Sequence, residues 1–263
     1  NLIKNGNGTL TISGANNSAY NGTTRINAGT LQISVASNAL GSGLLELNGG
    51  SLQAGVASAT LTNTFSILAN SQISGTDNIV LNGTGTFSGG AILNITNTAV
   101  TQVSSLAGNG GLSISNGQFN LLSASTYTGS TAITNGTLII FANNILPDTT
   151  DISITGSGGF NINGFNETVN SISGTGGSIT LSSGTLTTGG TGNTTFSGSF
   201  NGDGNLVKQG TGTFTLAGAN ATTGTFTINA GILNIASAGG LGSSGFHPTL
   251  VTVANGAALQ LST

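Results

Sequence analysis

The sequence lacks cysteine, methionine and tryptophan altogether. Without cysteine, a disulfide scaffold and thiolate metal sites are excluded. A chain without methionine does not begin at its own initiator residue, so we expect a processed product or a segment of a longer protein, with any signal peptide already removed. Proline is also scarce, with two residues in 263. Few backbone donors are therefore missing from any sheet that the chain forms.

Charged residues are also scarce. Charged residues make up 3% of the chain, against about 25% in an average soluble domain. The three cations, Lys4, Arg25 and Lys208, are too few and too scattered to form a phosphate-neutralising patch or a polybasic membrane anchor. No apolar run approaches the roughly 20 residues of a membrane-spanning helix. We therefore predict no nucleic-acid partner and no integral membrane segment in this chain.

Small polar residues and glycine fill much of the sequence, and glycine alone occupies 45 positions. Apolar residues alternate with them in short runs, such as Leu31, Ile33 and Val35, or Leu233 and Ile235. A period of two residues is typical of a half-buried β-strand. No segment sustains a period of 3.6 residues over ten positions, so helices are essentially excluded and the chain is predicted to be all-β.

Asn–Gly pairs separate many of these runs. Both residues tolerate positive φ, so such pairs predict tight corners. An antiparallel sandwich would use the same pairs in hairpins, but their frequency, the short strands and the scarcity of bulky core residues favour coils stacked into a β-solenoid. The pairs include Asn21–Gly22, Asn48–Gly49, Asn82–Gly83, Asn116–Gly117, Asn135–Gly136, Asn163–Gly164 and Asn255–Gly256.

Internal repeats support the solenoid. Residues 2–16 read LIKNGNGTLTISGAN, and residues 206–220 read LVKQGTGTFTLAGAN. Downstream, TTRINAGTLQIS at 23–34 matches TFTINAGILNIA at 225–236. A third, weaker copy reads YTGSTAITNGTLII at 127–140. Self-similarity of this kind indicates stacked structural units that bury their apolar faces against one another.

The string K-x-G-x-G-T-[LF]-T-[IL]-x-G-A-N, followed by I-N-A-G-x-L, resembles the autotransporter-associated β-strand repeat, also called the passenger-associated transport repeat. Such repeats occur in passenger regions of bacterial type V secreted proteins. The resemblance implies a right-handed parallel β-helix that is secreted and carried on the bacterial cell surface.

We therefore predict that residues 1–263 form a single continuous right-handed parallel β-helix of roughly 11–13 coils. Stronger repeat copies lie at 2–47, 127–142 and 204–242. Each coil takes roughly 20–25 residues, and a stacking distance of about 4.8 Å gives a rod of about 50–60 Å. Aliphatic side chains are expected in stacked columns inside, with Thr, Ser and Asn in polar ladders outside.

Residues suited to catalysis are few. Asp148 and Asp151, with Glu167 further along, are the carboxylates to consider for an enzyme acting on polysaccharides. We interpret Asp148 and Asp151 as turn residues that cap backbone amides. His247 is the only histidine, and without a second histidine or a cysteine it is expected to be a surface-loop residue. We predict no catalytic, cofactor-binding or metal-binding residues, no cofactor, and no enzyme activity.

Two functions remain in view. The first is an extracellular structural or adhesive rod, a passenger stalk or adhesin whose ligand the sequence does not reveal. The second is a subunit of an extracellular filament that stacks end to end through its terminal coils, because the alternating pattern runs into both ends without capping residues. A β-helix enzyme acting on polysaccharides is a minor alternative. Thr–x–Thr pairs such as Thr9 and Thr11 also resemble the hydroxyl ladders of ice-binding solenoids, although their spacing is irregular.

Overall fold

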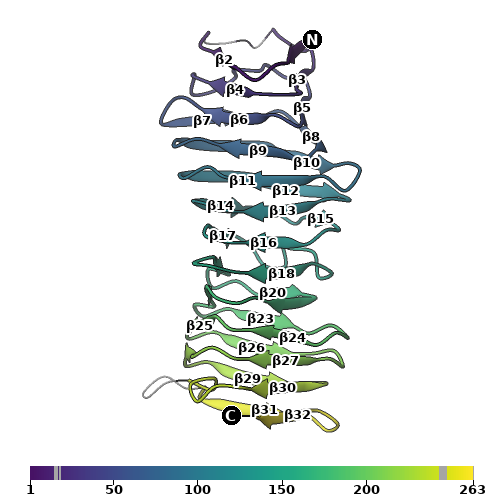
Figure 1. Cartoon of the computed structure of the whole chain (residues 1–263), viewed down its shortest axis with the longest axis vertical. Coiled ribbons are helices and arrows are strands. Elements are labelled where there is room, and N and C mark those ends of the chain that lie inside the picture. Colours follow the sequence, from purple (N-terminus) through teal and green to yellow (C-terminus); the bar gives the residue numbers. More distant parts are fainter. Residues whose placement is uncertain (15–16, 18, 243–247, 263) are drawn as a thin grey trace. The chain divides into compact units, whose positions relative to one another are not determined.

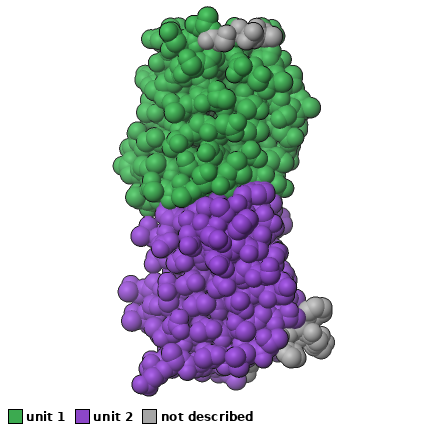
Figure 2. Space-filling view, turned by 180° about the vertical axis from the view of Figure 1, so that it is seen from behind, with its two compact units in different colours: residues 1–129 green, residues 130–263 purple. Residues whose placement is uncertain are grey.

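The computed structural model describes residues 1–14, 17, 19–242 and 248–262. The chain divides into two compact units, Asn1–Gly129 and Ser130–Thr263, which Figure 2 colours separately. Both consist of short β-strands, and the described residues contain no helix. The predicted all-β class is therefore confirmed. The single continuous domain stays a prediction, and the two units are described one at a time.

The described residues of unit 1 form fifteen strands, most of them three to five residues long. They are β1 (Leu2–Lys4), β2 (Thr9–Ile12), β3 (Thr24–Ile26), β4 (Thr30–Ile33), β5 (Leu45–Asn48), β6 (Ser51–Ala54), β7 (Ser58–Leu61), β8 (Phe65–Ala69), β9 (Ser71–Ser74), β10 (Asn78–Phe87), β11 (Ile92–Ile95), β12 (Val100–Gly108), β13 (Gly111–Ile114), β14 (Gln118–Leu121) and β15 (Thr126–Tyr127).

In unit 2, the residues outside 243–247 and 263 form seventeen strands of two to four residues. They are β16 (Thr131–Ile133), β17 (Thr137–Ile140), β18 (Asp151–Ile154), β19 (Gly159–Asn161), β20 (Glu167–Val169), β21 (Ser171–Ser173), β22 (Ser178–Thr180), β23 (Thr185–Thr188), β24 (Thr194–Phe196), β25 (Ser199–Gly202), β26 (Asn205–Lys208), β27 (Thr213–Leu216), β28 (Ala221–Thr222), β29 (Thr225–Ile228), β30 (Ile232–Ile235), β31 (Leu250–Val253) and β32 (Ala258–Leu261).

In both units the strands pair in parallel with strands one coil away, as Figure 1 shows. In unit 1, one sheet runs β1-β3-β5-β8-β10-β12-β14 and a second runs β2-β4-β6-β9-β11-β13. In unit 2, the sheets include β20-β23-β26-β29-β31 and β24-β27-β30-β32. Leu10 pairs with Leu31 and Leu31 with Leu52, so one coil takes 21 residues there. The chain is a parallel β-solenoid of about 12 turns, which confirms the predicted fold and coil number.

Period-two alternation places one side of each strand inside the coils. In unit 1, an aliphatic column follows the paired positions Leu31, Leu52, Ile73, Ile95 and Ile114, all of them buried. Each buried side chain of this kind contributes roughly 1.5–3 kcal/mol from apolar burial. Parallel strands depend on both neighbours, so this stabilisation accumulates from coil to coil.

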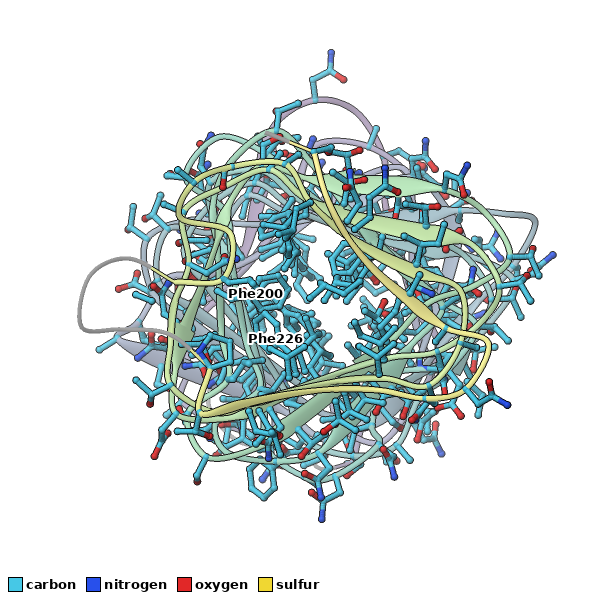
Figure 3. The ribbon with its side chains drawn as sticks, turned by 90° about the horizontal axis from the view of Figure 1, so that it is seen from below. Phe200 and Phe226 are labelled. Carbon is cyan, nitrogen blue, oxygen red and sulfur yellow. The ribbon has the colours of Figure 1, made fainter. Side chains whose placement is uncertain are left out.

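Aromatic side chains fill part of the interior of unit 2. Figure 3 shows Phe200 and Phe226 pointing inward, and neither is exposed to solvent. Phe200 makes edge-to-face contacts with Phe196 and Phe214, with ring centroids 5.5 and 6.4 Å apart. Such contacts add to the stabilisation that comes from burial.

Most of the Asn–Gly pairs form corners as predicted. Gly49, Gly117, Gly164 and Gly256 have φ values of 109°, 58°, 81° and 82°, in the left-handed region that glycine adopts without a steric penalty. These corners allow each short strand to turn onto the next side of the coil.

The predicted corner at Asn82–Gly83 is wrong. This pair lies inside β10, where the register with β12 shifts between Leu81 and Thr84, as in a β-bulge. A side chain at Gly83 would place its Cβ 2.0 Å from the Asn63 carbonyl oxygen. Glycine is required here because two backbones approach closely, and not because the chain turns.

Candidate functional site

Asp148 and Asp151 are exposed and lie at a turn. The Thr150 amide donates to the Pro147 carbonyl at 2.9 Å, so the predicted turn is confirmed. Asp151, however, accepts hydrogen bonds from the side chains of Asn170 and Ser171 on the neighbouring coil. Through Oδ1, Asp151 therefore joins two neighbouring coils.

The carboxylate that caps amides is Glu167, at the start of β20. Its side chain is buried, with 1% of the residue exposed. Its Oε2 accepts from the amides of Ile145 and Leu146 at 2.9 and 3.2 Å, and its Oε1 from the Thr168 amide at 3.0 Å. Glu167 thereby fixes the long connection between β17 and β18.

Burial is the main reason that the pKa of Glu167 is raised from 4.5 to about 7. The three amide hydrogen bonds oppose this shift, and the charge of Asp148 adds a little to it. The sequence held a signal for this burial that we did not use. In the alternating segment Glu167–Thr168–Val169, the carboxylate lies on the same side of the strand as the buried valine.

The raised pKa predicts a pH dependence of stability. The folded state binds the Glu167 proton more tightly than the unfolded chain, for which the ordinary pKa of 4.5 applies. The contribution of Glu167 is therefore fully present below about pH 4.5 and lost as the pH rises through about 7. We expect the urea midpoint of unit 2, followed by amide hydrogen exchange, to fall across this window.

The matched control is Glu167→Gln, which keeps the shape of the side chain but does not titrate. Subtracting its pH profile from that of the wild type isolates Glu167 from the other carboxylates. A wild-type midpoint that rises from pH 4.5 to 7 relative to this variant would contradict the assignment.

Lys4 ends β1 with its side chain turned into the coil, where 6% of the residue is exposed. Its Nζ donates to the carbonyl oxygens of Asn5, Gly6 and Ala28 at 3.2, 2.7 and 3.0 Å. The first two carbonyls belong to its own corner and the third to the corner one coil away. The ammonium group therefore ties two successive corners together. Gly29 is required beside it, because a Cβ there would lie 2.4 Å from the Gly6 oxygen.

Lys208 repeats this arrangement in unit 2. Its Nζ donates to the carbonyl oxygens of Gln209, Gly210 and Ala230 at 2.7, 2.8 and 3.2 Å. Only 1% of the residue is exposed, and burial lowers the pKa of its ammonium group. We call these two arrangements the lysine clamps: Lys4 or Lys208 together with its three carbonyl partners.

Composition alone suggests that both lysines are scattered surface cations, whereas both are buried. Strand alternation is the signal for this burial, since Lys4 shares a strand face with Leu2, and Lys208 with the buried Leu206. Because most lysines in folded proteins are exposed, the alternating pattern alone does not identify these two as buried. Arg25 is then the one side-chain cation that the described residues leave partly exposed.

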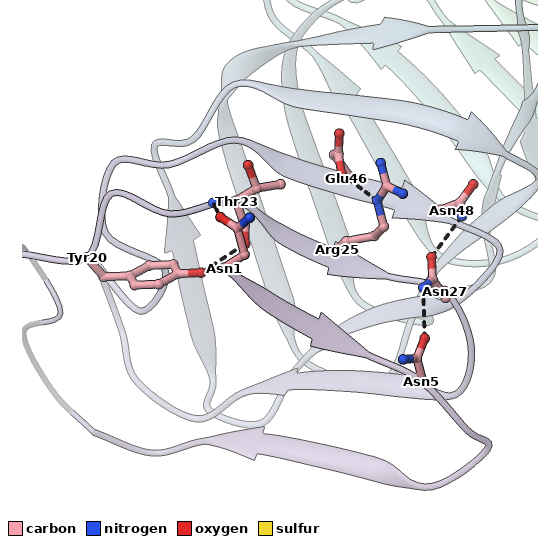
Figure 4. Close-up of polar contacts among 8 residues, drawn as sticks. All are labelled: Asn1, Asn5, Tyr20, Thr23, Arg25, Asn27, Glu46 and Asn48. Carbon is pink, nitrogen blue, oxygen red and sulfur yellow. Dashed lines mark hydrogen bonds and ion pairs between the residues drawn. The ribbon is translucent and has the colours of Figure 1, made fainter.

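Arg25 on β3 and Glu46 on β5 form the single ion pair of the described residues, shown in Figure 4. The Arg25 Nε and Glu46 Oε2 atoms are 2.6 Å apart. Beside them runs an amide ladder, in which Asn27 donates to Asn5 and Asn48 donates to Asn27, both at 2.8 Å. Both features join consecutive coils on the outside of unit 1.

We expect this ion pair to contribute little to stability. The Arg25 side chain is 40% exposed, and solvent screens exposed ion pairs so that many contribute nothing measurable. Replacing Glu46 by glutamine should therefore leave the free energy of unfolding of unit 1 nearly unchanged. Urea denaturation followed by circular dichroism at low and high salt provides the check, and a loss of several kcal/mol would show that the pair is not simply screened by solvent.

The second sheet of unit 1 presents a surface without charge. We call it the uncharged face: the outward side chains of β2, β4, β6, β9, β11 and β13, none of which contains a charged residue. One row along it consists of paired positions on the six successive strands: Thr9, Thr30, Ser51, Gln72, Asn94 and Ser113.

A second row follows the same face two residues further along the strands. It contains Thr11, Gln32, Gln53 and Ser74. Thr9 and Thr11 therefore begin rows that mix hydroxyls with amides, and neither row is a pure threonine ladder. The predicted outward polar ladders are confirmed.

Other candidate features give no further site. The described residues contain no group of three or more His, Cys, Asp or Glu that could hold a metal ion, and His247 lies outside them. Clefts of about 310 and 320 Å³ are both lined by Asn1 and Leu2, at the first coil of unit 1. No helix in the described ranges is long and apolar enough to cross a membrane.

A comparison with known protein families identifies three repeat segments in this solenoid. A family model described as Passenger-associated-transport-repeat matches residues 2–33, 115–140 and 206–235. The chain carries passenger-associated transport repeats. The first match runs from β1 to β4, and the third runs from β26 to β30. Both β1 and β26 end in a clamp lysine. The repeat thus supplies both the corner lysine and the Asn–Ala–Gly corner that it binds.

The predicted resemblance to this repeat is confirmed at all three copies. The middle repeat begins at Ser115, upstream of the weaker copy that the sequence analysis recognised from residue 127. It begins after β13, so it holds no counterpart of the clamp lysine. No curated protein and no solved structure matches the chain significantly.

Proposed function

We propose that this chain is a non-catalytic, adhesive part of a secreted autotransporter passenger, displayed at the bacterial cell surface. The observation that carries the proposal is the coincidence of passenger-associated transport repeats with coils of a parallel β-solenoid. Passenger-type repeats support secretion, and a solenoid supplies a long series of outward side chains at fixed spacing.

The polar groups support a structural rather than a chemical role. Lys4, Lys208 and Glu167 are buried and engaged with backbone groups. Asp151 bridges neighbouring coils, and Arg25 pairs with Glu46. These six charged residues therefore join neighbouring coils, while uncharged hydroxyls and amides form the outward rows that a surface or partner meets.

Surface display tests the proposal. The chain would replace the passenger of an unrelated autotransporter in a non-adherent bacterial strain, with an unrelated β-solenoid of equal length as control. We expect protease-sensitive display on intact cells, and retention on polysaccharide-coated or protein-coated surfaces at least several-fold above the control. Display without any gain in retention would refute the adhesive role, and failure of export would refute the assignment as a passenger.

A second candidate is end-to-end association into a filament. It is favoured by the scarcity of charge, with 3% of residues charged, because few like charges oppose the stacking of identical molecules. Electron microscopy should show filaments of the purified chain that are lost in Leu250→Lys and Leu261→Lys variants. Discrete particles of the wild-type chain would remove this candidate.

A further inference from the structure

The uncharged face of unit 1 has the chemistry of a binding surface for a particular class of partner. Its two rows carry hydroxyl and amide groups, which act as both donors and acceptors of hydrogen bonds. Within a row, successive groups lie about 4.8 Å apart, and the rows are about 7 Å apart. The result is a regular grid of neutral hydrogen-bonding groups.

Contacts within the grid hold its side chains in place. The Thr11 hydroxyl donates to Gln32 Oε1 at 3.0 Å, and the hydroxyls of Ser51 and Ser74 are 2.6 Å apart. These contacts use only part of the bonding capacity, since the amide nitrogen of a glutamine carries two further donors. Gln72 is exposed, and Gln32 and Gln53 are partly exposed. The face is therefore ordered before a partner binds, which lowers the entropic cost of binding.

Charge limits the partner. None of the six strands carries a charged residue, and the ion pair Arg25–Glu46 belongs to β3 and β5 of the other sheet. A polyanion or polycation would lose water on this face without gaining an opposite charge. A polyol loses neutral hydrogen bonds to water and regains neutral hydrogen bonds to the rows.

The shape of the face favours an extended partner. Its paired positions continue from strand to strand over six coils, so a polymer lying across the coils meets successive hydroxyl and amide groups. Ile92 is its one markedly exposed aliphatic side chain, at 38%, so the contact is mainly polar.

We propose that the uncharged face binds an uncharged polysaccharide chain through its two hydroxyl and amide rows. This inference rests on the adhesive role proposed above and names the class of partner for one face. No aromatic residue lies on these six strands to stack on a sugar ring. Binding at one face is therefore weak, and adhesion depends on many copies acting together.

The test uses the full chain on immobilised cellulose, dextran and galactomannan, with hyaluronan and gelatin as the anionic and protein probes. We expect retention on at least one neutral polysaccharide that changes less than about twofold between low and high salt, because no ion pairs contribute. A variant with Gln32→Ala, Gln53→Ala and Gln72→Ala should bind at least about tenfold more weakly, since three hydrogen-bonding groups are removed.

The matched control replaces Ser66, Thr86 and Gln102, outward residues on β8, β10 and β12, by alanine. It should bind within about twofold of the wild type, since these strands belong to the other sheet. Circular dichroism verifies that both variants fold.

Three results would overturn the inference: retention on hyaluronan or gelatin alone, no retention on any neutral polysaccharide, or equal losses in both triple variants. If displayed cells still adhere while the purified chain shows one of these results, the polysaccharide inference fails and the adhesive role stands. If displayed cells do not adhere, the adhesive role itself fails.

Discussion

Replacing Lys208 by methionine is expected to lower the free energy of unfolding of unit 2 by about 3 kcal/mol. Methionine retains most of the length and apolar character of the lysine side chain, so the packing of its methylene groups changes little. The loss comes from the carbonyl oxygens of Gln209, Gly210 and Ala230, which lose a shared donor at distances of 2.7–3.2 Å. A buried acceptor without a donor costs about 1–3 kcal/mol.

Urea denaturation followed by far-ultraviolet circular dichroism measures the effect. Amide hydrogen exchange of β26, β27 and β29 should locate it, because the two corners of the clamp adjoin these strands. The matched control is Arg25→Met, which removes a cation that is 40% exposed and should leave the free energy of unfolding nearly unchanged. Equal effects of the two substitutions would mean that the clamp contributes nothing beyond the lysine charge.

Replacing Phe200 by alanine is expected to cost about 4 kcal/mol, within the range for large aromatic residues in cores. Phe200 has no exposed surface and contacts the rings of Phe196 and Phe214 edge to face. Replacing it by alanine removes buried apolar surface and leaves a cavity inside the stack of coils, whose walls are held in place by the neighbouring residues. Short strands in a solenoid cannot collapse into such a cavity without moving the register of their neighbours.

The same denaturation experiment tests this prediction, with Phe141→Ala as the control in the same unit. Phe141 is 40% exposed, so its truncation should change the free energy of unfolding by less than about 1 kcal/mol. Phe200→Leu should lie between the two, because leucine fills part of the cavity. A loss below about 1 kcal/mol for Phe200→Ala would show that the aromatic contacts do not support the stack.

Much of the fold was predictable because a solenoid repeats a local rule. Period-two alternation, as at Leu31 and Ile33, predicts the strands, and the internal repeats predict that these strands stack in coils. The Asn82–Gly83 pair shows the limit of this reasoning. A glycine needed for a corner and a glycine needed for close backbone approach look alike in sequence, and only the strand pairing of β10 with β12 distinguishes them.

The candidate surface was predictable only in kind. Composition predicts outward hydroxyls and amides, but the register between strands decides which of them align. Thr9 aligns with Thr30, Ser51 and Gln72 because the coils there take 21 residues each. The next coil takes 22 residues, yet the row continues from Gln72 to Asn94 because the extra residue lies outside the paired strands. The same extra residue inside a strand would displace the row, since side chains alternate between the two faces of a strand.

The sequence by itself determined that this chain is all-β, stacked in parallel coils and similar to passenger-type repeats in three segments, because strand periodicity and repeat motifs are local properties. Only the tertiary structure decided which of its few charged side chains are buried and which groups they contact. Lys4 and Lys208 each reach a carbonyl 22 to 24 residues away, and Glu167 reaches amides 21 and 22 residues back. These partners become neighbours only when one coil lies on the next, and burial there depends on the partners being present.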